Sequence, residues 1–192
     1  MRRHILIING NPDSAPERLS TALANAYAGA AAAAGFSVAR LDLGEMDFPV
    51  LRHGADFLTR PSDSDIVHAR DEILRADHLV FIYPLWLGGP PALLKAFMEQ
   101  VSRAGFALTQ GTGGFPKGQL KGKSARILVT MGMPALAYRL LYRAHGVQAF
   151  NRSILGIAGV RPIATSYLGA IGLERRCREA LAIAASLGHQ GQ

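Results

Sequence analysis

Residues 78–101, HLVFIYPLWLGGPPALLKAFMEQV, decide the fold of this chain. The stretch opens with a short apolar run, 78–83, that predicts a β-strand ending at Pro84. Two glycines and two prolines follow, and from Pro90 onward apolar residues recur at the spacing of one helix face. A strand, a loop and a helix in this order form the basic unit of a layered α/β domain.

The same alternation extends in both directions along the chain. Further strands are expected at four places, at residues 4–9, 36–43, 125–131 and 161–168. Further helices are expected from about Pro16 to Gly35, at 62–75 with Ser62 or Asp63 as the cap, at 134–145 and at 173–187, with another possible at 151–157. Five strands with helical crossovers predict a single domain, residues 1–192, with a parallel sheet in the order 2-1-3-4-5 and helices on both faces.

Composition excludes several classes of protein. The chain has 192 residues, of which 49% are hydrophobic and 18% charged, so it can bury a large core and is not disordered. A single cysteine, Cys177, rules out an internal disulfide and two-cysteine zinc spacings, and it favours a cytoplasmic location. No metal site is expected. No apolar run is long enough for a secretory signal or a membrane span.

The net charge of +7 raises the question of nucleic-acid binding. The cations are spread along the chain and form no block of like charges, and no nucleic-acid-binding module is recognisable. We therefore expect no nucleic-acid partner. A pocket for a phosphate-bearing cofactor explains the surplus of cations better.

Ligands of such a sheet bind outside the carboxyl ends of its strands, near the point where the strand order reverses. The loop after the first strand, residues 9–20, contains turn-forming residues, the hydroxyls of Ser14 and Ser20, and the cation of Arg18. It opens a helix, and the exposed amides of a helix N-terminus bind phosphate. A mononucleotide phosphate would fit, and a simple capped turn is the alternative.

Two common nucleotide motifs are absent. No Gly-x-Gly-x-x-Gly follows the first strand, which disfavours a standard dinucleotide-binding domain. Residues 118–124, GQLKGKS, resemble a P-loop, but they have one residue too few between the glycines and precede a strand.

The loop after the third strand places Trp86, the only tryptophan, at a strand end with small residues behind it. A flat aromatic ligand needs an apolar wall beside its face and backbone amides at its polar edge. This loop offers both, although a tryptophan that fills the core is the alternative.

Residues 83–101 closely resemble the Tyr-Pro-Leu-Trp-Trp…Pro-Ala-Leu-Leu-Lys signature of the flavodoxin-like NAD(P)H:quinone oxidoreductases of the flavodoxin-2 type. That family includes bacterial drug-activity modulators and the ancillary reductases of potassium-efflux systems. The first loop is similar to the family's Gly-His-Pro-x-x-Ser segment, and residues 131–138 stand where the family has Thr-Gly-Gly…Tyr. The resemblance covers nearly the whole chain and implies a flavodoxin-like three-layer sandwich.

The resemblance implies a flavin cofactor, NAD(P)H as co-substrate, and a quinone or similar small electron-poor acceptor. Its flavin-phosphate and ribityl contacts fall on Asn11, Leu19 and Ser20, beside the cation Arg18. Its isoalloxazine contacts fall on two segments, which are Leu85, Trp86, Leu87 and Gly88, directly after Pro84, and Thr130, Met131, Gly132 and Met133. The amides of residues 86–88 are expected to bond the N5–O4 edge of the ring, and those near residues 130–133 its pyrimidine edge.

Tyr138 lines up with the family's active-site tyrosine, and with His145 it is expected to donate to the acceptor or to stabilise charge there. The chain departs from the family at two points. The usual histidine of the first loop is Asn11, and the position of the catalytic histidine is Ala144, with His145 one residue later. Without the resemblance, the two candidates would be an ordinary helix-face tyrosine and a capping histidine.

The sequence does not distinguish FMN from FAD as the cofactor. Arg175, Arg176 and Arg178 would suit an adenylate phosphate and FAD, but a solvated basic helix face explains them equally. Related proteins are commonly homodimers, and we expect such an interface to include residues 111–118 and the apolar side chains of Phe48, Leu51, Phe57 and Leu58.

Two other functions compete with the enzyme. One is a regulatory flavoprotein that binds a transporter or another partner. The other is a one-electron carrier of the flavodoxin type, although such carriers are strongly acidic and this chain is basic.

Overall fold

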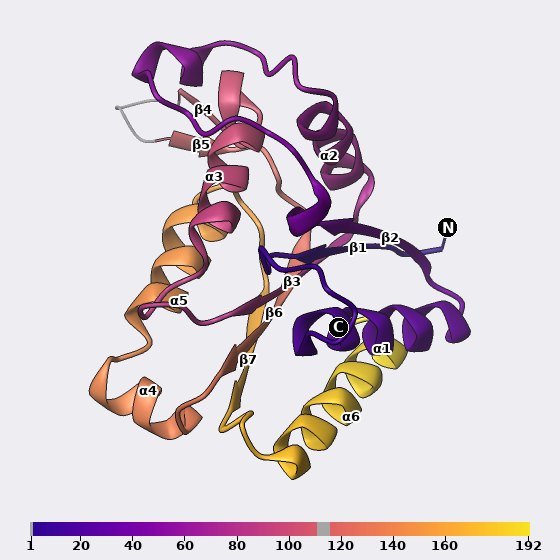
Figure 1. Cartoon of the computed structure of the whole chain (residues 1–192). Coiled ribbons are helices and arrows are strands. Elements are labelled where there is room, and N and C mark those ends of the chain that lie inside the picture. The colour runs from indigo at the N-terminus through magenta and orange to yellow at the C-terminus, as the bar shows by residue number, and fades with distance from the viewer. Residues whose placement is uncertain (1, 111–115) are drawn as a thin grey trace.

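The computed structural model describes residues 2–110 and 116–192. Its centre is a five-stranded sheet in which all neighbouring strands are parallel, in the order β2-β1-β3-β6-β7 (Figure 1). The strands are β1 (His4–Asn9), β2 (Ser37–Asp42), β3 (His78–Pro84), β6 (Ser124–Met131) and β7 (Ile163–Gly169). Numbered within the sheet alone, this is the predicted order 2-1-3-4-5, which is confirmed.

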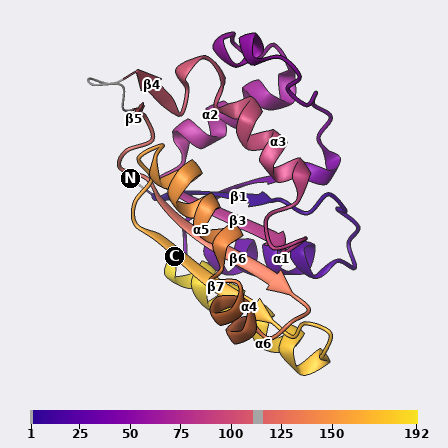
Figure 2. The same ribbon diagram turned by 90° about the vertical axis from the view of Figure 1, so that its left-hand side faces the viewer.

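Helices cover both faces of the sheet (Figures 1 and 2). On one face, α1 (Leu19–Ala33) and α6 (Glu174–Gln190) pack against each other. The other face carries α2 (Ser64–Arg75), α3 (Ala92–Val101), α5 (His145–Ala149) and the π-helix η5 (Phe150–Gly156). A short helix, α4 (Ala135–Leu141), extends from the edge near β7. None of the helices within these described ranges is long and apolar enough to cross a membrane.

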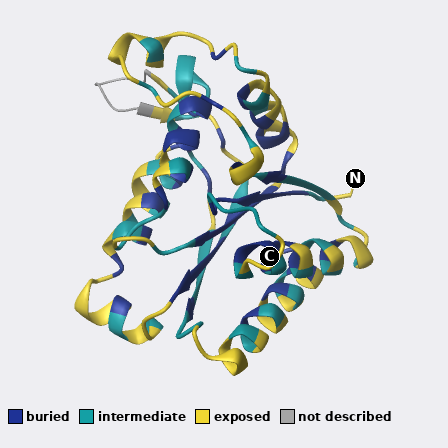
Figure 3. Cartoon of the chain, in the orientation of Figure 1, coloured by how far each residue is buried: buried dark blue, intermediate teal, exposed yellow. Residues whose placement is uncertain are grey.

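The central strands β1, β3 and β6 are buried on both faces, as their continuous apolar runs predict, whereas the edge strands β2 and β7 are mostly half-buried. Along β1, Ile5 and Ile7 belong to the core under α1 and α6, whereas Leu6 and Ile8 belong to the core under α2 and α3. All four side chains are fully buried. Burial of one such side chain contributes about 1.5–3 kcal/mol. Figure 3 shows the buried strands at the centre and exposed residues on the outer helix faces.

The first helix begins later than the predicted Pro16. It starts at Leu19, with Arg18 as its N-cap residue. The Asp13 side chain accepts from the amide of Ala15, and the amide of Arg18 donates to the Ala15 carbonyl, so turns occupy the preceding residues. The prediction that Asp63 or Ser62 caps α2 is met by Asp63.

The helix predicted at 134–145 is present as α4, but it ends earlier, at Leu141, and a separate helix, α5, begins at His145. Arg143 and Ala144 between them have φ values of 51° and 48°, in the left-handed region. The break turns α5 toward the loop after β3, where Gly146 packs directly on the Gly88 backbone. No glycine or proline interrupts residues 135–145, so local propensity does not predict this break, which depends on a tertiary contact.

The long segment between α3 and β6 contains the 3-10 turn η3 (Arg103–Gly105) and the antiparallel pair β4 (Leu108–Gln110) and β5 (Pro116–Gly118). Most of the predicted interface segment at 111–118 lies outside the described residues.

Two further 3-10 turns, η1 (Leu43–Glu45) and η2 (Gly54–Leu58), interrupt the irregular segment after β2. The placement of Phe48 at an interface is wrong, because its ring is buried and meets Phe97 edge-on at 6.0 Å. Leu51 is half-buried, and Phe57 and Leu58 are exposed.

Candidate functional site

Three loops leave the sheet at one edge, at the carboxyl ends of β1, β3 and β6. The strands are in register there, with Asn9 beside Ile82 and Pro84 beside Thr130. The amide of Gly10 donates to the Ile82 carbonyl at 2.8 Å, which carries this alignment past the end of β1. The three loops singled out by composition are therefore neighbours, as the fold requires.

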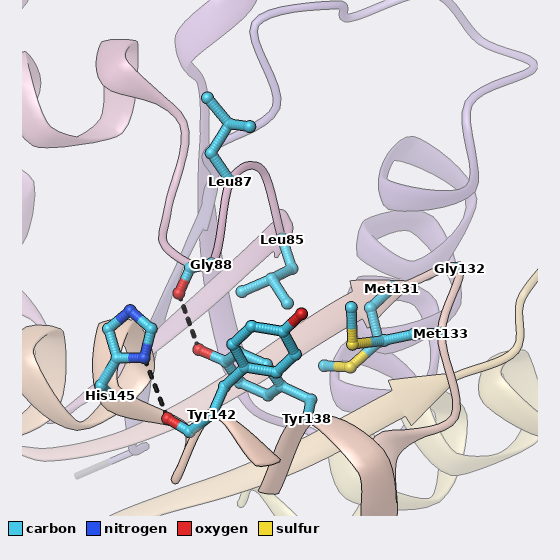
Figure 4. Close-up of a pocket in the computed structure, with 9 residues that line it drawn as sticks. All are labelled: Leu85, Leu87, Gly88, Met131, Gly132, Met133, Tyr138, Tyr142 and His145. Atoms are coloured by element: carbon cyan, nitrogen blue, oxygen red, sulfur yellow. Dashed lines mark hydrogen bonds between the residues drawn. The ribbon is translucent and has the colours of Figure 1, made fainter.

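A pocket of about 310 Å³ lies at this edge. Figure 4 shows its residues, which come from the loop after β3, the end of β6 and the loop after it, α4 with the residue that follows it, and the start of α5. Its lining consists of Leu85, Leu87, Gly88, Met131, Gly132, Met133, Tyr138, Tyr142 and His145. All of these except Tyr142 were singled out from the sequence. Leucine and methionine side chains make an apolar wall of the kind that a flat ring needs.

A tight turn, residues 86–89, forms one rim of the pocket. Trp86 and Gly89 exchange two backbone hydrogen bonds, of 2.9 and 3.0 Å. The two residues between them have positive φ, 48° at Leu87 and 84° at Gly88. Such a φ is unstrained for glycine, but for leucine it costs roughly 1 kcal/mol. Strained residues of this kind cluster at binding sites.

The turn exposes fewer amides than the sequence suggested. The amide of Trp86 is committed to Gly89, whereas those of Leu87 and Gly88 have no acceptor among residues 2–110 and 116–192. The alternative that Trp86 fills the core is wrong, because half of its surface is exposed. Two adjacent backbone donors thus face outward beside the pocket.

The loop after β6 offers a second pair of donors. Neither the Gly132 nor the Met133 amide has a partner in the part of the chain that the structure describes. Thr130 is buried in the strand, and its carbonyl accepts from the Leu85 amide at 2.8 Å. Thr130 therefore holds the two loops together and does not line the pocket.

Tyr138 lies at the base of the pocket and is fully buried. Its hydroxyl donates to the Gly88 carbonyl at 2.8 Å and accepts from the Val147 amide at 3.4 Å. Burial raises the pKa of this hydroxyl, so it stays protonated. The side chain ties α4 to both the 86–89 turn and α5.

His145 is the first residue of α5 and lines the pocket, whereas Ala144 is buried behind it. Its Nδ1 lies 2.9 Å from the Tyr142 carbonyl, which only accepts, so Nδ1 carries the proton. The other side of the ring faces Gly88, where an added Cβ would lie 3.4 Å from Nε2. The structure therefore brings His145 and Tyr138 to one pocket, from opposite sides of the break between α4 and α5.

The first loop is held together by its own side chains. Asn11 is buried, and its Nδ2 donates to Ser20 Oγ at 2.8 Å while its Oδ1 accepts from the Asp13 amide at 3.2 Å. Asn9 Oδ1 accepts from the Asn11 amide in turn. Asn11 thus braces the loop against the first turn of α1.

The N-terminus of α1 has the features of an anion site. Its first turn contains no acidic residue, and the side chain of its N-cap residue, Arg18, makes no capping hydrogen bond within the described residues. Over the described ranges, the amides of Leu19, Ser20 and Thr21 have no acceptor, and the buried Thr21 Oγ1 has no partner either. Buried polar groups are normally paired, so this cluster of unused donors fits a bound phosphate.

Most of the candidate cations are already paired. Arg18 Nε lies 2.6 Å from Asp13 Oδ2. The pKa of Asp13 is lowered, first by the Ala15 amide that it accepts and further by Arg18. On α6, Arg175, Arg176 and Arg178 pair with glutamates of the same helix. This pairing favours a solvated helix face over an adenylate site.

Tyr142 is the lining residue that the sequence reasoning missed. It follows Tyr138 by four residues, the spacing that places two side chains on one helix face, and this signal was available. No group of three or more potential metal ligands occurs in the described part of the chain.

The chain belongs to the Flavodoxin_2 family, whose model, described as a flavodoxin-like fold, matches residues 3–187. It is 34% identical to an uncharacterized NAD(P)H oxidoreductase of Haemophilus influenzae over 70% of this chain and 67% of that protein. It is 30% identical to the FMN-dependent NADH:quinone oxidoreductase 1 of Colwellia psychrerythraea over 58% of this chain, and the match spans about half of that relative, 55%. The resemblance predicted from the motifs is confirmed.

Solved structures agree over nearly the full length. Smu.1420 of Streptococcus mutans matches with a TM-score of 0.81 at 26% identity, over 97% of this chain and 99% of that one. The NAD(P)H:quinone oxidoreductase of Methanothermobacter marburgensis matches with a TM-score of 0.83 over 100% of both chains, at 22% identity, which shows a shared fold.

Proposed function

We propose that this protein is an NAD(P)H oxidoreductase that holds FMN at the carboxyl edge of its sheet and reduces quinones or similar electron-poor aromatic compounds. One observation carries the proposal. An apolar pocket lies at the same sheet edge as a helix N-terminus, and within the described parts of the chain two pairs of amides beside the pocket and the first amides of that helix have no acceptor. The names of the related NAD(P)H and FMN-dependent oxidoreductases support the same function.

The chain's donors match the chemistry of FMN. The first turn of α1, with Ser20 and Thr21, would hold the phosphate, and Asn11 would keep that turn in place. The amides of Leu87 and Gly88 would bond one polar edge of the ring, and those of Gly132 and Met133 the other. Trp86 would cover the ring from the rim of the pocket.

FMN is favoured over FAD for a structural reason. The arginines of α6 that would meet an adenylate phosphate are engaged with glutamates four or fewer residues away. Arg18 is paired with Asp13, so its attraction for a bound phosphate would be weakened by that carboxylate.

When bound, FMN would take a hydride from NAD(P)H and pass two electrons to the acceptor. The protein's part is to bind, orient and exclude water. The unused amides would stabilise negative charge on the reduced ring, because fixed donors in an apolar pocket cost no reorganisation. His145 and Tyr142, the residue that follows α4, would contact the acceptor, and donor and acceptor would visit the same open face in turn.

A homodimer and a cytoplasmic location remain part of the proposal. The exposed side chains of Phe57 and Leu58 support an interface on the side of η2. Light scattering of the purified protein, compared with the Leu58→Glu variant, tests the dimer, and a monomeric wild type would contradict it.

Reconstitution and turnover test the function. The purified protein is incubated with FMN, desalted, and mixed with NADPH or NADH and then with menadione. We expect a yellow protein whose colour bleaches with the nicotinamide and returns with the quinone over repeated cycles. A colourless protein would contradict the cofactor, and a yellow protein without turnover would favour a regulatory flavoprotein instead.

A further inference from the structure

The pocket contains two tyrosine hydroxyls that differ in what they bind. The Tyr138 hydroxyl donates its proton to the Gly88 carbonyl at 2.8 Å and accepts from the Val147 amide. Its side chain is fully buried. To donate to a substrate, it would have to leave a buried backbone carbonyl unpaired, which is energetically unfavourable.

The Tyr142 hydroxyl has no such commitment. Its ring stacks on that of Tyr138, with centroids 6.2 Å apart and planes 28° apart. The two rings point in different directions, and the Tyr142 hydroxyl is directed toward Leu85 and Met131 inside the pocket (Figure 4). No hydrogen bond to this hydroxyl is present among the described residues, and the side chain is 49% exposed.

His145 strengthens the contrast. Its Nδ1–H donates to the Tyr142 carbonyl at 2.9 Å, so this nitrogen is not available to a substrate. The same contact anchors the backbone of Tyr142 at the pocket. In this arrangement the available O–H donor is the Tyr142 hydroxyl.

We propose that Tyr142 is the catalytic residue that gives a proton to a carbonyl oxygen of the acceptor, and that Tyr138 is a positioning residue that holds the 86–89 turn. This inference rests on the proposed function. A quinone gains a hydride, which NAD(P)H supplies through the cofactor, and one proton to become a hydroquinone. The Tyr142 O–H bond breaks as the new O–H bond forms on the quinone, and water returns a proton to the half-exposed tyrosine.

The test compares acceptors in Tyr142→Phe, Tyr138→Phe and the wild type. Ferricyanide takes electrons without forming an O–H bond, so the ratio of menadione to ferricyanide reoxidation rates isolates the proton step. General acid catalysis contributes about 10²–10⁴-fold, so we expect this ratio to fall at least tenfold in Tyr142→Phe. In Tyr138→Phe we expect a lower melting temperature and a ratio within twofold of the wild type.

A binding measurement gives a second readout that needs no turnover. Chromone, an aromatic ketone that is not reduced, is titrated against the oxidised protein, with naphthalene as the ligand without a carbonyl. Loss of one hydrogen bond of about 1 kcal/mol predicts a roughly fivefold weaker chromone affinity in Tyr142→Phe and an unchanged affinity for naphthalene.

The outcomes separate the two proposals. If the wild type is colourless or does not reduce menadione, the proposed function fails, and the chromone titration still decides whether Tyr142 meets a carbonyl. An unchanged rate ratio or an unchanged chromone affinity in Tyr142→Phe would overturn the assignment, as would a selective quinone defect in Tyr138→Phe.

Discussion

The first loop and the 86–89 turn lie at neighbouring strand ends but are built in opposite ways. The first loop is braced by side chains, with the buried Asn11 bonded to both Ser20 and Asp13. The 86–89 turn is closed by backbone bonds between Trp86 and Gly89, and it has a leucine with positive φ and exposed side chains. A rigid loop suits the phosphate of a bound cofactor, which stays in place. An exposed turn suits substrates, which must enter and leave the pocket. The predictions below test this difference in the protein reconstituted with FMN.

The largest effect is expected at the contact between α5 and the turn. A Cβ on Gly146 would lie 2.0 Å from the Gly88 carbonyl oxygen and 2.7 Å from Gly89 Cα. Backbone atoms cannot yield as a side chain does, so Gly146→Ala should displace the turn. Overpacking of this kind costs about 1–3 kcal/mol. We expect a melting temperature lowered by several degrees and loss of FMN on desalting.

Gly29→Ala is the matched control for that substitution. Gly29 lies on the exposed face of α1, and an added Cβ meets nothing within 4 Å. It should raise stability by about 0.5–1 kcal/mol and retain FMN. Equal behaviour of the two alanine variants would refute the close contact with the turn.

His78 lies at the amino end of β3, away from the two loops. Its protonation is therefore expected to change the stability of the fold without changing either loop. His78 is buried beside Arg3 and Arg126, and burial, followed by these two cations, lowers its pKa to about 4. Its ordinary pKa is 6.5. As the pH falls, this histidine is therefore protonated in the unfolded chain before it is protonated in the folded one. The free energy of unfolding that its neutral form contributes above pH 6.5 is lost as the pH falls toward 4. The expected loss between pH 7 and pH 5 is about 2 kcal/mol.

Urea unfolding at each pH measures this loss. His78→Gln should remove most of the pH dependence in this window, and the loss should be the same with and without FMN. A wild-type stability that stays level from pH 7 to pH 5 would contradict a buried neutral His78.

Because Asn11 braces the first loop, its replacement should weaken the binding of a flavin with a phosphate more than that of a flavin without one. Asn11→Ala would leave the Asp13 amide and Ser20 without their partner and loosen the first turn of α1. We expect FMN affinity to fall about tenfold, equivalent to about 1.4 kcal/mol, and riboflavin affinity to change little. Ser14→Ala, in the same loop, should change neither affinity. An equal loss for FMN and riboflavin would mean that the loop does not hold the phosphate.

The smallest effect is expected from relief of strain in the turn. Leu87 has φ of 48°, and its side chain is fully exposed. Leu87→Gly should therefore stabilise the fold by up to about 1 kcal/mol, because no contact is lost. Thermal unfolding measures the change. A destabilised variant would show that the exposed leucine makes a contact, as a partner subunit would provide.

Much of the fold followed from sequence patterns with a clear physical cause. Continuous apolar strands predicted a sheet covered on both faces, and Ile5 to Ile8 are fully buried as expected. The strand order and the clustering of the three loops then followed from topology. The break at Arg143 and Ala144 did not, because it depends on a contact between segments far apart in the chain.

The candidate site was predictable in place but not in detail. The motifs located the lining residues around Leu85 and Met131, which share one pocket. Hydrogen bonds to Gly88 and Val147 occupy the hydroxyl of Tyr138 and not that of Tyr142. The spacing of residues in the sequence does not predict these bonds. Likewise, the pairing of Arg18 with Asp13 is a local geometric choice between several possible partners.

Titration of the protein with FMN and with riboflavin, followed by quenching of flavin fluorescence, distinguishes a site for phosphate and ring from a site for the ring alone. We expect FMN to bind at least tenfold more tightly than riboflavin, because the first turn of α1 holds the phosphate while the pocket holds the ring. Equal affinities would contradict the phosphate cradle, and no quenching with either flavin would contradict the site itself.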